Sequence, residues 1–190
     1  MGFRFPGIAL SLAFVLTAGQ SAEIQTQHVT DLAQHPVNVF ATRGKMQVLL
    51  FARSDCPITK RYAPELQRIA REFVKDPVVF WLVFPDPAET PADIRATVEQ
   101  YRFPGTPVLD PKHELVRIAR ATIAPEAAVF DRDSSLLYHG RIDDLYVDIG
   151  KSRAAAQVHD LEDAISAALA GKRVRQPETR AVGCSLADVE

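Results

Sequence analysis

The chain has 190 residues, of which 47% are hydrophobic and 24% charged, so it can bury one sizeable core. Its formal net charge is -2 and its lysines and arginines are scattered, which leaves no basic stripe of the kind that a nucleic-acid binder needs. These properties predict one domain and disfavour nucleic acid as a partner.

Residues 1–22 have the layout of a secretory signal peptide. A single basic residue, Arg4, precedes an apolar core from Ile8 to Ala18, and small residues follow it. The core is short for a transmembrane span, and no cysteine near its end suggests a lipid anchor. The alternative is a buried N-terminal strand or helix. We expect export to the periplasm or the exterior, where disulfides persist, and no stable membrane insertion once the signal is removed.

The first half of the mature chain predicts a strand, a helix and a second strand. Residues 23–38 are polar and irregular, with a short helical turn expected in 28–37 and an opening strand at 37–41. The bounded apolar run 48–52 predicts a buried strand, and apolar residues then recur at helical spacing from 57 to about 74. The run 78–84 predicts a central strand whose two faces are both covered.

The second half alternates in a similar way. A proline-rich loop leads to a helix at 91–101 with Thr90 as its N-cap. After it we expect a short extended piece at 106–110, a short helix at 111–120, an antiparallel hairpin at 127–130 and 136–139, and a helix at 158–169 that closes at Gly171. This order predicts an α/β layer sandwich with helices on both faces of a mixed sheet.

The chain therefore divides into a signal peptide, 1–22, a folded domain, 23–171, and a tail, 172–190. The tail carries Cys184 and shows no sustained period, and Pro177 argues against a continuing helix. We expect it to be irregular and loose.

Cys56 lies where the strand ends and the helix begins, directly before Pro57. The unpaired N–H groups and the dipole at a helix N-terminus favour a thiolate, which is the nucleophilic form. Lys60 and Arg61 act in the same direction, whereas Asp55 opposes it. The alternative is an inert buried cysteine, but the polar flanks favour a reactive one.

Two segments carry a resemblance to a known family. DCPITKRY at 55–62 and APEAAVFD at 124–131, in this order and with the TPVLDPKHEL insert between them, resemble the thioredoxin-like proteins of the TlpA and AhpC/TSA (redoxin) group. The resemblance covers roughly 37–169. It implies a thioredoxin-like fold, a mixed central β-sheet flanked by helices on both faces, with a helix-containing insert before the cis-proline strand.

The resemblance also assigns a substrate groove. It implies that Pro125 is cis and packs beside Cys56, although an ordinary trans proline at a strand start is the alternative. A substrate segment would lie extended against Ala124, with Pro57 at the groove.

The hairpin after Pro125 returns the chain to the same end of the sheet, at GRIDD, 140–144. Arg141 could steady a thiolate there, and Asp143 or Asp144 could handle a proton. The alternative is a solvated loop.

Several residues near Cys56 differ from the active-site residues of related families, and these differences exclude or disfavour particular reactions. A thioredoxin-type dithiol enzyme needs a second cysteine at position 59, which is Thr59, so dithiol exchange within one helix is excluded. The Thr59 hydroxyl could instead donate to the sulfur. Arg53 and Leu49 stand where a peroxiredoxin site has Thr or Ser and Pro, and Lys60 stands where a copper chaperone has a second cysteine. Peroxidase activity and copper delivery are therefore disfavoured.

No metal site or cofactor is expected, because the five histidines show no ligand spacing with each other or with cysteine. Cys56 remains as the nucleophile and Cys184 as a distant thiol. Cys184 could resolve a mixed disulfide or could close a permanent structural bond, and the sequence leaves both open.

We read the chain as an exported thiol:disulfide oxidoreductase that acts on protein thiols or disulfides. The alternatives are a non-catalytic redoxin-fold binding module and an atypical thiol peroxidase.

Overall fold

The computed structural model describes residues 1–2, 26–42 and 44–186 and has a five-stranded mixed sheet at its centre, in the order β3-β2-β1-β5-β6. The central strand β1 (Met46–Phe51) is parallel to β2 (Val78–Phe84), which is parallel to β3 (Thr106–Leu109). On its other side β1 pairs antiparallel with β5 (Glu126–Phe130), and β5 pairs antiparallel with β6 (Leu136–Gly140). The expected mixed sheet and its antiparallel hairpin are confirmed.

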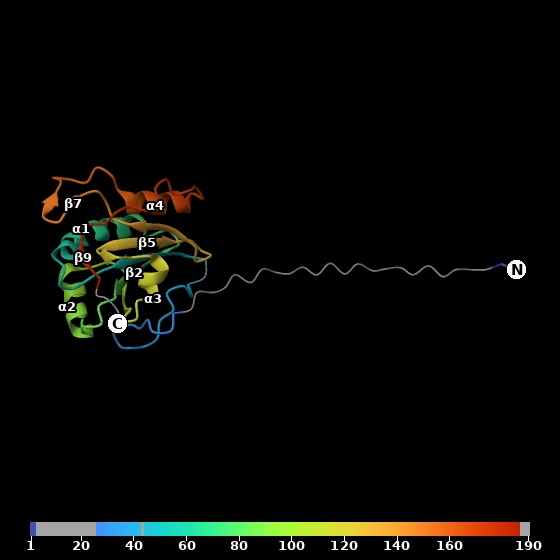
Figure 1. The fold of residues 1–190 in the computed structure, drawn as a ribbon, viewed down its shortest axis with the longest axis horizontal. Coiled ribbons are helices and arrows are strands. Elements are labelled where there is room, and N and C mark those ends of the chain that lie inside the picture. The colour runs from blue at the N-terminus through green and yellow to red at the C-terminus, as the bar shows by residue number, and fades with distance from the viewer. Residues whose placement is uncertain (3–25, 43, 187–190) are drawn as a thin grey trace.

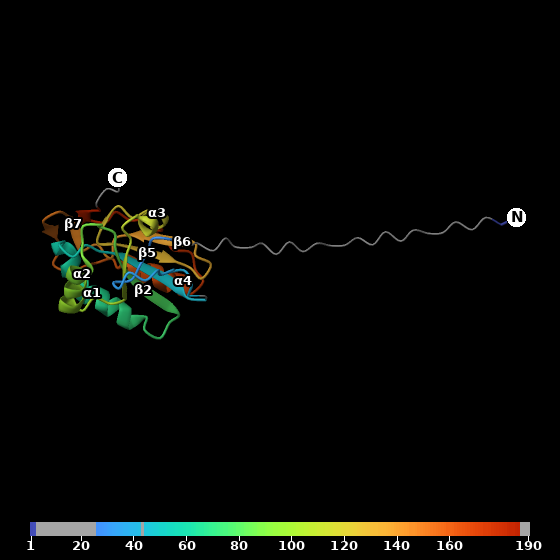
Figure 2. The same cartoon turned by 90° about the horizontal axis from the view of Figure 1, so that it is seen from below.

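Among the described residues, four helices cover the two faces of this sheet. They are α1 (Pro57–Glu72), α2 (Pro91–Tyr101), α3 (Glu114–Ala119) and α4 (Asp160–Leu169). Figure 1 shows α1 and α4 on one side of the central strands, and Figure 2 shows α3 on the side opposite to α1 and α2. The expectation of helices on both faces is therefore confirmed.

The sequence of β1 explains the two layers, because successive side chains of a strand point to opposite faces. Val48 and Leu50 pack in a core that includes side chains of α1, α2 and α4. Leu49 and Phe51 pack in a second core with α3 and the segment around 29–40. A strand covered on both sides is expected to be mostly apolar, and all six residues of β1 are buried. The one polar residue, Gln47, accepts from the Trp81 indole N–H at 2.8 Å.

The opening strand expected at 37–41 is wrong. The chain turns there instead, with the Asn38 side chain accepting from the Phe40 N–H at 3.0 Å and the Ala41 N–H donating to the Asn38 carbonyl at 3.2 Å. Asparagine satisfies nearby backbone groups in this way and so favours a turn. The apolar side chains Val39 and Phe40 are buried against the sheet face without pairing in it.

The expected helical turn in 28–37 is also absent. Asp31 closes a tight turn by accepting from the Ala33 and His35 N–H groups at 2.8 and 2.9 Å, and Gln34 has a positive φ of 65°.

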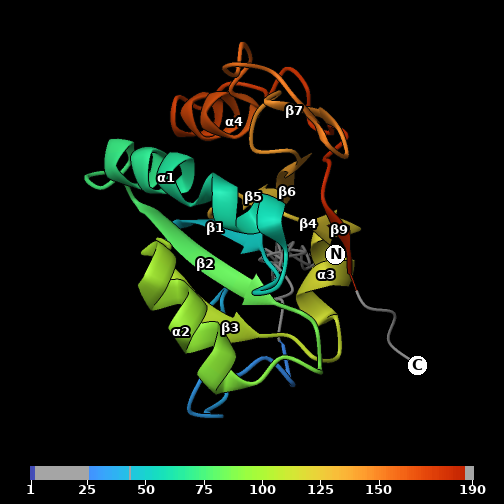
Figure 3. The same ribbon diagram turned by 90° about the vertical axis from the view of Figure 1, so that its left-hand side faces the viewer.

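Two small strand pairs were not expected from the sequence. β4 (Ile123–Ala124) pairs antiparallel with β9 (Cys184–Ser185), and β7 (Tyr146–Asp148) pairs with β8 (Lys151–Ser152). Figure 3 shows β9 beside β4 at the end of the tail. Pieces of two or three residues are too short to show a period, which is why the sequence gives no sign of them.

The expectation of a loose tail is therefore wrong for its described part. The His139 N–H donates to the Pro177 carbonyl at 3.0 Å, and the Thr179 N–H donates to the His139 carbonyl at 3.1 Å, so the tail lies parallel to β6 and pairs with it at Glu178. The Thr179 hydroxyl lies 2.6 Å from the Tyr138 hydroxyl and accepts from the Arg141 N–H at 3.1 Å.

The expected signal peptide lies almost wholly outside the described residues. Among the residues that the structure describes, no helix is both long enough and apolar enough to span a bilayer.

Candidate active site

Cys56 is the N-cap residue of α1, and Pro57 is the first residue of the helix. The backbone of Cys56 is extended, with φ -76° and ψ 118°, as is usual for an N-cap residue. The Cys56 side chain makes no capping hydrogen bond, and the residue is only 1% exposed. The helix start expected from the sequence is confirmed, and Cys56 lies beneath another part of the chain.

The covering part is the tail, because Cys56 and Cys184 form a disulfide. The bond joins residues 128 positions apart, with a Cα–Cα distance of 6.1 Å. The sequence left the state of these two cysteines open, and the structure shows them joined.

The Ala124–Pro125 peptide bond is cis and lies directly against this disulfide. The Cys56 sulfur is 3.4 Å from the Ala124 carbonyl oxygen, and Cys184 is the register partner of Ala124 in the β4–β9 pair. The resemblance assigned a groove at Ala124 and Pro125 for an extended substrate segment. In this oxidised structure, β9 of the same chain lies there.

Arg53 connects the loop before Cys56 to the tail. Its Nη1 donates to the Ser185 carbonyl at 3.0 Å, and its Nε and Nη2 donate to the two oxygens of Asp55 at 3.0 and 2.8 Å. Asp86 lies 3.4 Å from the same guanidinium. The Asp55 carboxylate raises the pKa of Arg53, and Arg53 holds the pKa of Asp55 below its ordinary value.

Glu89 supports the same loop from the other side, since its carboxylate accepts from the Ser54 N–H at 2.5 Å. Burial raises the pKa of Glu89. Sequence reasoning missed the structural roles of both Arg53 and Glu89. Arg53 stands in the polar break between a buried strand and Cys56, which was an available signal, whereas Glu89 sits in an unremarkable surface-type loop.

Glu126 was also missed. It follows Pro125, is 5% exposed, and accepts from the Thr122 and Ile123 N–H groups at 2.8 and 3.2 Å, so it shapes the turn that leads into β4. A carboxylate in the otherwise apolar stretch Ala124–Phe130 was the sequence signal for this role.

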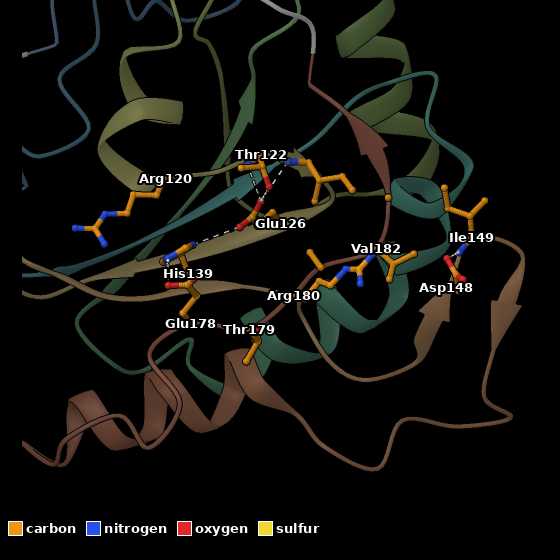
Figure 4. Close-up of a pocket in the computed structure, with 13 residues that line it drawn as sticks. Arg120, Thr122, Glu126, His139, Asp148, Ile149, Glu178, Thr179, Arg180 and Val182 are labelled. Atoms are coloured by element: carbon orange, nitrogen blue, oxygen red, sulfur yellow. Dashed lines mark hydrogen bonds and ion pairs between the residues drawn. The ribbon is translucent and has the colours of Figure 1, made fainter.

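A pocket of about 740 Å³ lies next to Gly183, the residue before Cys184 (Figure 4). Ile123 and Gly183 line it next to the β4–β9 pair, and His139 lies 3.5 Å from both Glu126 and Glu178. The tail forms one wall of this pocket along 178–183.

The Thr59 side chain does not reach the sulfur as expected. Its hydroxyl is buried and, among the described residues, has no hydrogen-bond partner. A buried hydroxyl without a partner costs free energy, so Thr59 has a donor available for another state of the site.

Arg141 has a local partner away from the sulfur, because its Nε donates to Asp160 at 2.6 Å. Asp160 is therefore the acidic partner of Arg141 in this structure, and a role of Arg141 beside a Cys56 thiolate stays a prediction.

The two aspartates of the same loop also have local partners. Asp143 accepts from the Tyr62 hydroxyl at 2.6 Å, which ties the loop to α1, and burial raises the pKa of its carboxyl. Asp144 accepts from the Gln157 and Val158 N–H groups at 2.6 and 3.0 Å.

A group of candidate metal ligands lies on another surface, where single atoms of Glu65, His159 and Glu162 lie within 4.8 Å of one another. Arg68 already bonds both carboxylates, at 2.7 Å to Glu65 and also to Glu162. A guanidinium between the two carboxylates supplies their counter-charge, so we assign no metal here.

Comparison with known families gives a match over most of the folded part. The profile of the AhpC/TSA family matches residues 19–139. A search of curated proteins finds no match.

Solved structures share the fold at low sequence identity. An uncharacterized conserved protein from Geobacillus kaustophilus is 23% identical, with a TM-score of 0.69 over 85% of this chain and 88% of that one. A hypothetical protein from Sinorhizobium meliloti 1021 is 22% identical, with a TM-score of 0.70 over 83% and 87%. A secreted Mycobacterium tuberculosis disulfide oxidoreductase homologous to Escherichia coli DsbE is 17% identical, with a TM-score of 0.52 over 81% and 99%. These likenesses show a thioredoxin-like fold.

Proposed function

Because this chain belongs to the AhpC/TSA family and has a thioredoxin-like fold, we propose that it is a thiol:disulfide oxidoreductase whose redox pair is Cys56 and Cys184. Its partners are protein thiols or disulfides in an exported compartment, and no cofactor is needed because the two sulfurs carry the electrons. The secreted oxidoreductase of similar fold supports this location, as does the signal-peptide layout of residues 1–22.

The observation that carries the proposal is the position of the disulfide. It joins the N-cap of a helix to a strand that pairs beside a cis-proline, so one sulfur lies at a helix N-terminus and the other lies in a strand of the tail. A bond that served only stability would not need a sulfur at a helix N-terminus, where the thiolate form is favoured.

The chemistry balances without another reagent. In the reducing direction, the Cys56 thiolate attacks a partner disulfide, a mixed disulfide forms, and one partner sulfur leaves as a thiolate and takes a proton from water. The Cys184 thiolate then attacks the Cys56 sulfur, the second partner sulfur leaves, and the bond seen here forms. Two electrons pass to the partner. The oxidising direction reverses these steps.

The helix start favours Cys56 as the thiolate in this cycle. Once the disulfide opens, the Cys56 sulfur is free to accept from the N–H groups of the first turn of α1, as N-cap side chains do. The unpaired Thr59 hydroxyl is the second donor that we assign to it. The Ala124 carbonyl opposes this ionisation, because an oxygen at 3.4 Å accepts from a thiol and repels a thiolate.

The anchored tail supports Cys184 as the resolving cysteine. The hydrogen bonds of Thr179 to His139 and Tyr138 are made outside the disulfide, and Cys184 lies five positions after Thr179. Five extended residues span at most about 18 Å, so a released Cys184 stays within that distance of its anchor and can return.

One observation favours a second candidate, a binding module with a static disulfide. Cys56 is 1% exposed, so in the closed state a partner cannot reach its sulfur unless the tail moves. Such a module would leave the bond intact during binding.

Exchange with glutathione separates the two candidates. The protein is equilibrated in buffers of graded reduced-to-oxidised glutathione, and free thiols are alkylated and counted by mass. We expect Cys56 and Cys184 to convert together from disulfide to dithiol, with a reduction potential in the range of exchange catalysts, above about -300 mV. Cysteines that stay joined under conditions that reduce catalytic dithiols, with no turnover of a disulfide substrate, would identify the static module.

A Cys184→Ser variant tests the order of attack. It should trap a partner on Cys56 as a stable mixed disulfide, because the resolving thiol is gone, and Cys56→Ser should trap nothing at that position. Trapping by neither variant would contradict the roles assigned here.

A further inference from the structure

Residues 183–185 bind at the cis-proline as an added strand would. Cys184 pairs with Ala124 and Ser185 with Ile123, in antiparallel register. Ala124 is completely buried, and the atoms that face Gly183 are main-chain atoms of Ala124 and Pro125.

Gly183 fits this surface because it has no side chain. A Cβ added there would lie 2.1 Å from the Ala124 carbonyl oxygen, 2.6 Å from its carbon and 3.0 Å from the Pro125 nitrogen. These are main-chain atoms next to a buried strand and cannot move aside as a flexible side chain can. Every residue other than glycine carries a Cβ, so the position before the cysteine admits only glycine in this register.

The position after the cysteine is recognised differently. Arg53 donates to the Ser185 carbonyl oxygen, whereas the Ser185 side chain is exposed. Asp55 and Asp86 hold the guanidinium in place. A main-chain carbonyl is common to all residues, so this contact favours an extended backbone and no particular side chain.

We propose that the groove selects extended polypeptide segments in which glycine directly precedes the reactive cysteine, and that residues 183–185 are a tethered copy of that ligand. This inference rests on the proposed function and names the substrate class of the same site. A partner's Gly-Cys segment lies along β4 in place of β9, with its cysteine opposite Ala124 and its next carbonyl on Arg53.

The exchange step fits this arrangement. When the partner cysteine is already in a disulfide, the Cys56 thiolate attacks that sulfur, the Cys56–partner bond forms, and the other sulfur of the partner disulfide leaves with the electron pair. The segment recognised is therefore the one that holds the attacked cysteine.

Peptides copied from the tail test the selection. The peptide Arg-Ala-Val-Gly-Cys-Ser-Leu and its Gly→Ala counterpart are each joined to 2-thiopyridone through the cysteine sulfur, and each is mixed with reduced Cys184→Ser protein. Release of 2-thiopyridone then reports the rate of attack by Cys56. The retained tail competes equally with both peptides, so the ratio of rates is unaffected by it. Glutathione activated in the same way serves as a small probe without a strand.

We expect the glycine peptide to react at least tenfold faster than the alanine peptide, because the added methyl group collides with the Ala124 carbonyl. Equal rates for the two peptides would overturn the glycine selection and leave the proposed function standing. Failure of both peptides and of the small probe to react would instead count against the proposed function. A Cys56→Ser control shows that the released 2-thiopyridone comes from Cys56.

A second variant tests the same contact within the chain. Gly183→Ala should shift the glutathione equilibrium toward the open dithiol at least tenfold, because β9 no longer fits against Ala124. Ala181→Ser, which also adds one atom to the tail, should leave the equilibrium within twofold of the parent. An unshifted equilibrium for Gly183→Ala would overturn the inference.

Discussion

At the residue scale, the site depends on contacts that hold the loop before Cys56. Arg53 makes one hydrogen bond to the Ser185 carbonyl of the tail and two to Asp55 in its own loop, and its side chain is only 20% exposed. Each of its partners is a main-chain carbonyl or a carboxylate, and a planar guanidinium suits such a fork better than an ammonium does.

Arg53→Lys should therefore favour the open dithiol. Lysine cannot bond Asp55 at two atoms while donating to Ser185, so closure loses about 1 kcal/mol, which is roughly fivefold in the equilibrium with glutathione. Alkylation and mass measurement report the fraction of open protein. Arg71→Lys, at the far end of α1, is the matched control, and a shift toward the disulfide would contradict the assigned role.

Tyr62 and Asp143 form a buried contact between α1 and the loop after β6. Tyr62→Phe leaves the Asp143 carboxylate without the hydroxyl at 2.6 Å, and we expect unfolding to need about 1–2 kcal/mol less free energy. Urea unfolding measures this loss. Tyr146→Phe is the control, since its ring packs 5.6 Å from that of Tyr62, and it should change stability by less than about 0.5 kcal/mol.

At the element scale, α3 begins on a buried carboxylate. Asp110 accepts from the Glu114, Leu115 and Val116 N–H groups at 2.7, 2.9 and 3.0 Å, and so satisfies donors that a helix start leaves free. Burial nevertheless raises the pKa of Asp110 to about 6, because desolvation of the charge outweighs these three bonds.

This raised pKa predicts a pH dependence. Between the unfolded value near 4 and the folded value near 6, the folded state binds more protons, so the contribution of Asp110 to stability is present at low pH and is lost as pH rises through about 6. When the pH is lowered from 7 to 5, the free energy of unfolding of the parent should rise by about 1 kcal/mol relative to that of Asp110→Asn. Urea unfolding at the two pH values measures this difference. Asp133→Asn, on an exposed turn, should show the same pH dependence of stability as the parent. If Asp110→Asn also shows the pH dependence of the parent, the raised pKa of Asp110 is contradicted.

At the scale of the whole molecule, the disulfide joins two segments 128 positions apart. Closing so long a loop restricts the unfolded chain, and the chain-entropy model assigns up to about 5 kcal/mol to it. Reduction of the disulfide should lower the free energy of unfolding by up to that amount. The shift in the urea midpoint between samples with and without reductant measures the loss. Cys184→Ser should unfold like the reduced parent and should not respond to reductant. A parent midpoint that reductant leaves unchanged would contradict a stabilising closure.

The division of the chain into signal peptide 1–22, domain 23–171 and tail 172–190 stays a proposal. The described tail is hydrogen-bonded to the domain at β6 and β4. We therefore expect a change that weakens these contacts to favour the open dithiol and also to lower the stability of the domain.

Local patterns in the sequence determined much of the fold. Strand β2 is apolar throughout and β1 is apolar except for Gln47, because the sheet is covered on both faces, and α1 and α2 carry prolines at their starts and, in α2, a threonine cap. These signals depend only on neighbours in the chain, so the helices, the central strands and the position of Cys56 could be predicted from the sequence.

Only the tertiary structure decided which thiol Cys56 meets and what lies in the groove. A two-residue strand has no period, and the pairing of Cys184 with Ala124 depends on where the hairpin of β5 and β6 returns the chain and on how Thr179 anchors the tail to it. Gly183 shows the same limit: its sequence neighbours say nothing of the Ala124 carbonyl that excludes a side chain there. Contacts between distant segments are set by the packing of the whole chain, and no local pattern encodes them.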